Sequence, residues 1–152
     1  MYLVDTNVLS VAAPVKTPFM PDLAAWMERH SQRLYLSAIT VAEIERGIAK
    51  LRRDGVHAKA DRYAAWLEAV LHLYAARILP LDIPVARLLG QLSDRARSTG
   101  QDPGLADLAI AATAQHHGYV ILTRNLRHFR PLGVSAHDPY ASLPLASPLP
   151  PA

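Results

Sequence analysis

Short apolar runs and stretches with helical periodicity alternate along the chain. Each run is only a few residues long, which suits a strand buried on both faces of a parallel sheet. The runs predict strands at Tyr2–Val4, Leu34–Leu36, Ile78–Leu81 and Tyr119–Leu122, with an edge strand at Val134–Ala136. Ligands of such sheets bind beyond the carboxyl ends of the strands, so functional side chains are expected there.

Amphipathic helices are predicted between these runs. They cover residues 22–29, 37–53, 57–77, 82–100 and 105–117, and a short helical turn precedes Gly133. Asp22 and Asp82 are placed to cap two of them, and Ser37 or Thr40 opens another. Gly118 is expected to end the last long helix. Strands that alternate with helices imply right-handed crossovers, and therefore an α/β fold with a mainly parallel sheet covered on both faces.

The length of the chain sets the domain organisation. A chain of 152 residues can bury one sizeable core and is too short for two domains of ordinary size. We expect one α/β domain over residues 1–140. Residues 141–152 carry no charge and repeat proline, which predicts an extended, flexible tail.

Composition and charge narrow the functional classes. A content of 51% hydrophobic and 19% charged residues excludes a disordered chain, and the absence of cysteine excludes thiol nucleophiles and favours a reducing cytoplasm. The start of the chain is unlike a secretory signal, and charges and prolines interrupt the most apolar stretch, so no membrane span is expected. The net charge of +3, with thirteen arginines among sixteen cations, favours an anionic partner.

Two aspartates stand out from apolar surroundings. Asp5 directly follows the first predicted strand, at the edge of the sheet where ligands bind. Asp5 or Thr6 can also cap the turn that follows, and both roles are compatible. Asp107 lies in a nearly apolar helical segment, where a buried carboxylate is costly unless it is paired or binds a metal. The alternative for Asp107 is an exposed acid stabilised by the helix dipole.

Glu43 has two interpretations. The spacing from Thr40 to Glu43 matches a capping box, in which the glutamate accepts a hydrogen bond from a backbone amide, and spacing alone slightly favours this cap. The other interpretation is a functional carboxylate near Asp5. Glu45 faces elsewhere on the same helix, and we expect a solvated residue that pairs with Arg46 or Lys50.

Three motifs resemble those of a known family, the PIN-domain nucleases, and within it the VapC-type toxins of bacterial VapBC toxin–antitoxin modules. The motifs are VDTNVLS at residues 4–10, LSAITVAEIERGI at 36–48 and ADLAIAATAQHHGYVILTRN at 106–125. The resemblance spans nearly the whole chain, in family order and spacing. It implies a PIN-like three-layer α/β/α fold and a divalent-metal-dependent endoribonuclease that acts as the toxin of a type II toxin–antitoxin system.

The resemblance also implies a site. Its acidic metal ligands and catalytic residues would be Asp5, Glu43 and Asp107, with Thr6, Thr123 and Asn125 as supporting residues. Mg²⁺ or Mn²⁺ suits such oxygen ligands. The chain departs from the family at Asn125, where many members carry Asp and others have an acid near His128. A neutral amide adds no charge, so the choice between one and two metals stays open.

Partners and competing functions complete the expectations. The resemblance implies an RNA substrate, a VapB-like antitoxin held by the hairpin from Ile39 to Arg77, and a homodimer; no residue pattern by itself reads a 2′-hydroxyl. A stand-alone RNA-processing nuclease and a catalytically weakened RNA- or protein-binding module are the alternatives. Zinc binding by His116, His117 and His128 lacks a suitable ligand spacing. A haloacid-dehalogenase phosphatase would need a second Asp at position 7, where this chain has Asn.

Overall fold

The central sheet of the protein is entirely parallel. The computed structural model describes residues 1–13 and 20–145. Its strands are β1 (Tyr2–Val4), β2 (Leu34–Ser37), β3 (Ile78–Leu79), β4 (Val120–Leu122) and β5 (Ala136–His137). Their order across the sheet is β3-β2-β1-β4-β5, and each neighbouring pair is parallel. The predicted parallel sheet is confirmed, and β1 lies at its centre.

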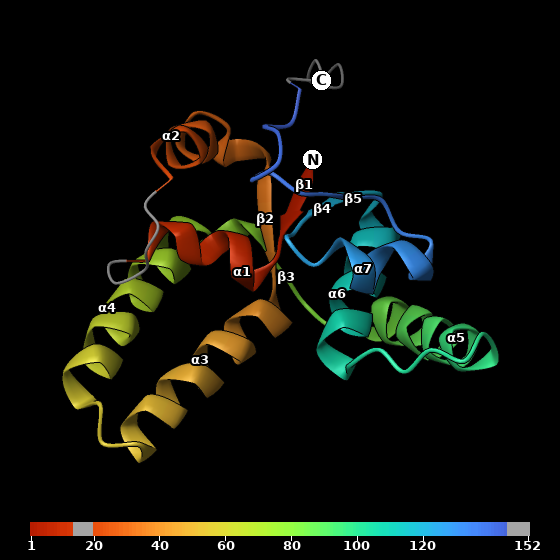
Figure 1. The fold of residues 1–152 in the computed structure, drawn as a ribbon, viewed down its shortest axis with the longest axis horizontal. Coiled ribbons are helices and arrows are strands. Elements are labelled where there is room, and N and C mark those ends of the chain that lie inside the picture. The colour runs from red at the N-terminus through yellow and green to blue at the C-terminus, as the bar shows by residue number, and fades with distance from the viewer. Residues whose placement is uncertain (14–19, 146–152) are drawn as a thin grey trace.

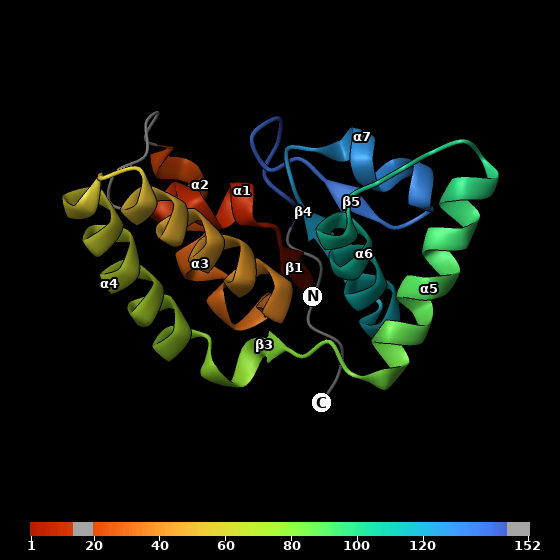
Figure 2. The same cartoon turned by 90° about the horizontal axis from the view of Figure 1, so that it is seen from below.

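Helices cover both faces of this sheet, which gives the three-layer α/β/α architecture that was expected. The helices are α1 (Thr6–Leu9), α2 (Pro21–Arg29), α3 (Ala38–Arg53), α4 (His57–Leu73), α5 (Ile83–Ser98), α6 (Leu105–His117) and α7 (Leu126–Phe129). Short 3-10 turns cover Ser10–Ala12, Ser31–Arg33, Ala75–Arg77 and Arg130–Leu132. Helices α1 to α4 lie on one side of the sheet and α5 to α7 on the other (Figure 1, Figure 2).

The core is divided in two by the sheet. Side chains alternate along a strand, so Tyr2 and Val4 of β1 pack with the cluster under α1 to α4. Leu3, between them, packs with the cluster under α5 to α7. Leu3 and Val4 are fully buried. Burial on both faces explains why this strand is a continuous apolar run in the sequence.

Most helix ends follow the local sequence signals, and one does not. Asp82 caps α5 by accepting a hydrogen bond from the Val85 amide over 3.1 Å, and Gly118 ends α6 with a φ of 68°, which only glycine adopts readily. The cap expected at Asp22 is wrong. Helix α2 begins at Pro21 after Met20, so Asp22 lies in its first turn. Proline at the first position has no amide hydrogen to satisfy, so the helix starts there without a side-chain cap.

The ends of several other elements differ from the prediction by a few residues. Helix α4 ends at Leu73, and a separate 3-10 turn carries the chain to Arg77, where one helix was expected. The strand expected at Ile78–Leu81 ends at Leu79, before Pro80, which has no amide hydrogen for a sheet. The edge strand lies at Ala136–His137, later in the chain than expected.

The described part of the predicted tail contacts the N-terminal strand. The Tyr2 hydroxyl donates a hydrogen bond to the Leu145 carbonyl over 3.4 Å. The rest of the tail, residues 146–152, lies outside the described residues, as do Pro14 and Pro18 of the loop before α2. A boundary at residue 140 therefore stays a prediction. None of the described helices is long and apolar enough to cross a membrane.

Candidate active site at the carboxyl edge of the sheet

The parallel sheet brings the ends of β1 and β4 to the same edge. Val4 pairs with Leu122 in the register of the two strands, so the residues that follow them, Asp5 and Thr123, are neighbours. The backbone continues this pairing beyond the strands, because the Asp5 amide donates to the Leu122 carbonyl over 3.0 Å. The fold thus places a carboxylate and a hydroxyl together at the edge where ligands of such sheets bind.

Asp5 is the most closely bound of the three predicted acids. Its Oδ1 accepts a hydrogen bond from the Thr6 amide over 2.7 Å, so it caps α1. Its Oδ2 accepts from the Thr123 hydroxyl over 2.7 Å and from Asn7 Nδ2 over 2.6 Å. Asp5 therefore both caps a helix and lies in the candidate site, and the prediction that these two roles are compatible is confirmed. These contacts hold the carboxylate in one orientation.

Burial makes the charge on Asp5 costly. The side chain is only 5% exposed, and desolvation raises the pKa of its carboxyl above the ordinary value of 3.8. Hydrogen bonds from Thr123 and Thr6 oppose this rise in pKa, while the carboxylates of Glu43 and Asp107 add to it. Glu43 and Asp107 therefore lie within electrostatic range of Asp5, although they come from different helices.

Glu43 reaches this edge from α3. Thr6 Oγ1 donates a hydrogen bond to Glu43 Oε2 over 2.5 Å. The capping box expected from Thr40 to Glu43 is wrong, because Ser37 caps α3 by accepting from the Ile39 amide over 3.2 Å. The helix begins at the end of β2, so Thr40 and Glu43 both lie inside it. Glu43 is therefore not needed as a backbone cap.

Glu45 is exposed, as expected. Its expected pairing with Lys50 is wrong, because Lys50 has another partner. Lys50 forms an ion pair with Asp54, one turn later in the chain, at the end of α3. Glu45 thus lies on the solvated face of α3, away from the site.

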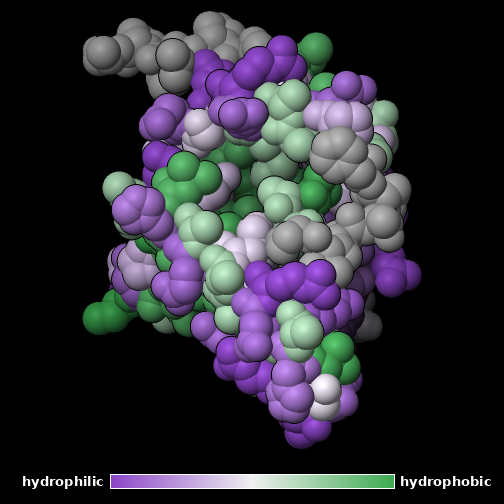
Figure 3. Space-filling view, turned by 90° about the vertical axis from the view of Figure 1, so that its left-hand side faces the viewer, coloured by the Kyte–Doolittle hydropathy of each residue, from purple (hydrophilic) through white to green (hydrophobic). Residues whose placement is uncertain are grey.

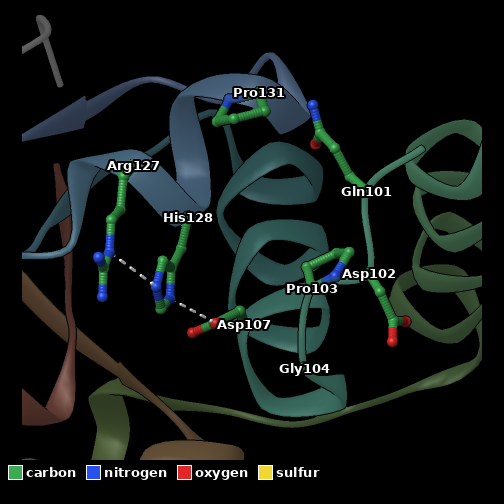
Figure 4. A pocket seen from close by; sticks show the side chains of 8 residues that line it. All are labelled: Gln101, Asp102, Pro103, Gly104, Asp107, Arg127, His128 and Pro131. Carbon is green, nitrogen blue, oxygen red and sulfur yellow. Dashed lines mark hydrogen bonds and ion pairs between the residues drawn. The ribbon is translucent and has the colours of Figure 1, made fainter. Parts of the chain in front are cut away.

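Asp107, in the first turn of α6, has the partner that its apolar surroundings require. His128 Nδ1 lies 2.8 Å from Asp107 Oδ2, and the side chains are 35% and 24% exposed respectively. The two residues line a pocket of about 360 Å³ between α6 and the 3-10 turn after α7 (Figure 4). Its lining consists of Gln101, Asp102, Pro103, Gly104, Asp107, Arg127, His128 and Pro131. The cavity is open and contains both acidic and basic groups.

Asn125 contributes its backbone to the site. Its amide donates to Thr123 Oγ1 over 3.0 Å, so one hydroxyl connects it to Asp5. Its side chain is exposed and makes no hydrogen bond within the described part of the chain. The place of this side chain in a metal site stays a prediction.

The sequence reasoning did not identify two of the polar residues at this edge. Asn7 binds Asp5, donates to Thr123 Oγ1 over 3.2 Å and accepts from the Arg124 amide over 3.1 Å. His128 binds Asp107 from a position 21 residues later in the chain. Asn7 was noted only as the residue that excludes a phosphatase motif, and no local spacing connects His128 to Asp107. The one sequence signal that could have indicated Asn7 as a site residue is its position two residues after Asp5.

The donor set fits a hard divalent cation. Carboxylate oxygens are its preferred ligands, and a cation beside Asp5 would offset the charge that burial makes costly. Among residues 1–13 and 20–145, no three acidic or histidine side chains already form a cage for an ion. Mg²⁺ keeps several of its waters and commonly binds proteins through one or two carboxylates, so such a cage is not required. The rings of His116 and His117, the histidines considered for zinc, meet edge to face at the opposite end of α6 from Asp107.

Comparisons with known proteins agree with this architecture. A model of the PIN domain family matches residues 2–132. The chain is 34% identical over 145 residues to Toxin FitB of Neisseria gonorrhoeae, an alignment that covers 92% of this chain and 99% of FitB. It is 35% identical over 144 residues to VapC ribonuclease Y4jK of Sinorhizobium fredii, with coverage of 92% and 98%.

A solved structure gives the same result in three dimensions. The crystal structure of FitAcB from Neisseria gonorrhoeae superposes with a TM-score of 0.79 at 37% identity, and the match covers 92% of this chain and 99% of that one. The family match extends from β1 to the 3-10 turn after α7, and so includes Asp5, Glu43 and Asp107. The chain belongs to the PIN domain family and is a homologue of the FitB and VapC toxins.

Proposed function

We propose that the protein is a divalent-metal-dependent endoribonuclease that hydrolyses RNA phosphodiester bonds as the toxin of a type II toxin–antitoxin system. One observation carries the proposal: β1, α3 and α6 bring Asp5, Glu43 and Asp107 within electrostatic range at one edge of the sheet. Clustered carboxylates without a nearby cation raise the pKa of a buried partner, which is a cost typical of functional sites. The kinship with a VapC ribonuclease and with Toxin FitB supports the same conclusion.

The metal ligands in this proposal are Asp5, Glu43 and Asp107, and the metal is Mg²⁺ or Mn²⁺. When bound, such an ion supplies a nucleophilic hydroxide from water and stabilises the charge on the phosphate and the leaving oxygen. The supporting residues orient the ligands. Thr123 and the Thr6 amide bind Asp5, and the Thr6 hydroxyl binds Glu43. Asn125 supports Thr123 through its amide.

Hydrolysis needs no nucleophile from the protein itself. The hydroxyls of Thr6 and Thr123 both donate to carboxylates, so their protons are held away from any substrate. The net charge of +3, despite an acidic site, favours attraction of a polyanion to the molecule. RNA is the substrate class that these properties and the kinship with a ribonuclease together favour.

An antitoxin partner is proposed for the apolar groove on the side of α1, α2 and α4. This groove of about 380 Å³ is lined by Leu9, Ala12, Ala24, Met27, Glu28, Ser31, Trp66, Ala69, Val70, Leu73 and Tyr74. Figure 3 looks onto this side of the molecule and shows apolar side chains in a hollow bordered by hydrophilic ones. An amphipathic segment of an antitoxin suits such a groove. We also propose a homodimer, which light scattering on the purified protein tests.

The decisive experiment compares RNA cleavage by the wild type with Asp5→Asn and Asp107→Asn. We expect both variants to lose Mg²⁺-dependent cleavage while they keep the circular dichroism of the folded protein. Asp94→Asn, at an exposed acid on α5, is the matched control and keeps activity. Cleavage that persists in Asp5→Asn would reject the proposed site. A folded wild type that binds RNA without cutting it in any divalent metal would favour the binding module instead.

A further inference from the structure

Asp107 is the end of a short chain of hydrogen bonds. Arg127 Nε donates to His128 Nε2 over 3.3 Å, and His128 Nδ1 lies 2.8 Å from Asp107 Oδ2. Figure 4 shows the three side chains in a row along one wall of the pocket. Arg127 and His128 lie in α7 beside Phe129, which is fully buried in the core. The imidazole is thus held at the rim of the pocket by an anchored helix.

The partners at the two ends of the imidazole specify the same proton arrangement. An arginine Nε–H can only donate, so His128 Nε2 must accept and carries no proton. Nδ1 then carries the ring proton and donates it to Oδ2 of Asp107. An ionised aspartate can only accept, which requires the same tautomer. The imidazole in this arrangement is neutral, so it leaves the negative charge of Asp107 intact.

We propose that His128, fixed as its Nδ1–H tautomer by Arg127, is a positioning residue for Asp107. Its hydrogen bond occupies Oδ2 and thereby restricts rotation of the carboxylate, which leaves Oδ1 available as a metal ligand. A neutral donor orients the ligand without adding a positive charge that would repel a cation. This inference rests on the proposed function, because it assumes that Asp107 is a metal ligand.

The partial exposure of the pair is the reason to assign it a functional role. Both side chains line the open pocket and both are more than one fifth exposed, so the contact contributes little to the core. Asp107 and His128 come from helices that already pack through buried residues such as Phe129 and Ile110. The fold therefore does not depend on the imidazole, and its variants are expected to fold.

The first test reads the tautomer in the metal-free wild-type protein. Long-range ¹H–¹⁵N correlation spectra at mildly alkaline pH distinguish an imidazole protonated at Nδ1 from one protonated at Nε2. We expect His128 to carry its proton on Nδ1. Assignment of the resonance comes from its loss in His128→Asn. A proton on Nε2 would overturn the proposal, because neither partner contact is then possible.

The second test measures the affinity of metal-free protein for Mn²⁺ by titration calorimetry. His128→Leu removes the donor, and we expect Mn²⁺ binding to weaken by about 10- to 100-fold, as is common when the partner of a metal ligand is lost. His128→Asn places an amide donor near the position of Nδ1, and we expect it to recover much of the affinity. His116→Leu, an exposed histidine at the far end of α6, is the control and binds as the wild type does.

The outcomes separate this proposal from the proposed function. Equal Mn²⁺ affinity of wild type and folded His128→Leu would overturn the positioning role, even if RNA is cleaved in a metal-dependent way. Weaker Mn²⁺ binding in His128→Leu with recovery in His128→Asn would support it, even if no RNA is cleaved. A wild type that binds no Mn²⁺ would overturn both.

Discussion

The hydroxyl of Thr6 donates a hydrogen bond to Oε2 of Glu43, and this contact joins the start of α1 to α3 across 37 positions of the chain. The amide of the same residue donates to Asp5. One threonine therefore orients two of the three acids, through its backbone on one side and its side chain on the other.

This double role predicts that Thr6→Val impairs the site while Thr6→Ser keeps it. Valine preserves the amide contact to Asp5 and the volume of the side chain but releases Glu43. We expect RNA cleavage to fall about 10- to 100-fold, as for other partners of metal ligands, and the free energy of unfolding to change by about 1 kcal/mol or less. Single-turnover cleavage and chemical denaturation measure the two effects.

Thr99→Val provides the control for that variant. Thr99 Oγ1 donates to the Ala96 carbonyl over 2.9 Å at the end of α5, and Thr99 does not line the pocket that contains Asp107. We expect unchanged cleavage in this variant. A folded Thr6→Val protein with wild-type activity would show that the orientation of Glu43 is not limiting.

Asp5 predicts a pH dependence of stability. Its pKa is raised above the ordinary value of 3.8, mainly by burial, so the folded state keeps a proton that the unfolded state has already released. The protonated Asp5 carboxyl thus contributes to the free energy of unfolding. This contribution is fully present below pH 3.8 and is lost as the pH rises through the folded-state pKa. Asp5→Asn has no such loss.

We therefore expect the melting temperature of Asp5→Asn, relative to that of the wild type, to rise as the pH increases from about 4 to 7. Scanning calorimetry in the presence of EDTA measures this difference. The comparison across pH removes the constant effect of the altered hydrogen bonds at Asn7 and Thr123. A difference that falls with pH would mean that the carboxylate is stabilised by its folded environment.

The proposed hydrolysis predicts the chemistry of the RNA ends. Attack by water on the phosphate leaves a 3′-hydroxyl and a 5′-phosphate, and it does not use the 2′-hydroxyl of the substrate. We expect the products to be ligatable without prior phosphorylation, and cleavage to stop in EDTA. A 2′,3′-cyclic phosphate that still forms in EDTA would contradict a metal-dependent hydrolysis.

Asn125 offers a gain-of-charge test at the fourth position of the site. The backbone amide of Asn125 donates to the Thr123 hydroxyl, which itself donates to Asp5. Asn125→Asp therefore adds a carboxylate near the proposed metal ligands. Because the side chain is exposed, we expect Mn²⁺ binding to tighten by about 1 kcal/mol, at the lower end of charge-assisted contacts. Gln115→Glu adds the same charge near the far end of α6 and is the control. Equal affinities of the two variants would place residue 125 outside the site.

The apolar groove predicts how an antitoxin is bound. Leu73 lines the groove and is 60% exposed, so Leu73→Asp is expected to fold. A carboxylate buried against the groove by a partner should weaken antitoxin binding by at least about 1.4 kcal/mol, which is a factor of ten. His72→Asp, at the neighbouring exposed residue of α4, is the matched control. If both variants bind the antitoxin as the wild type does, the groove is not its site.

Local sequence signals determined the order and type of the elements. Three- and four-residue apolar runs favoured strands, while Asp82 began one helix and Gly118 ended another by rules that depend on the residues next to them. Asp5 was found in the same way, because it directly follows an apolar run that predicts a strand, and functional side chains are expected at the end of such a strand. The motifs around Asp5, Glu43 and Asp107 indicated the family, which the comparisons confirm.

Only the tertiary structure decided what each acid contacts. The spacing from Thr40 to Glu43 slightly favours a cap, but β2 ends at Ser37 and α3 begins directly after it, so both residues lie inside the helix. His128 and Asp107 lie 21 residues apart on α7 and α6, so no local rule pairs them. Side-chain contacts between elements depend on how helices pack on the sheet, and a pattern read along one chain contains no measure of that packing.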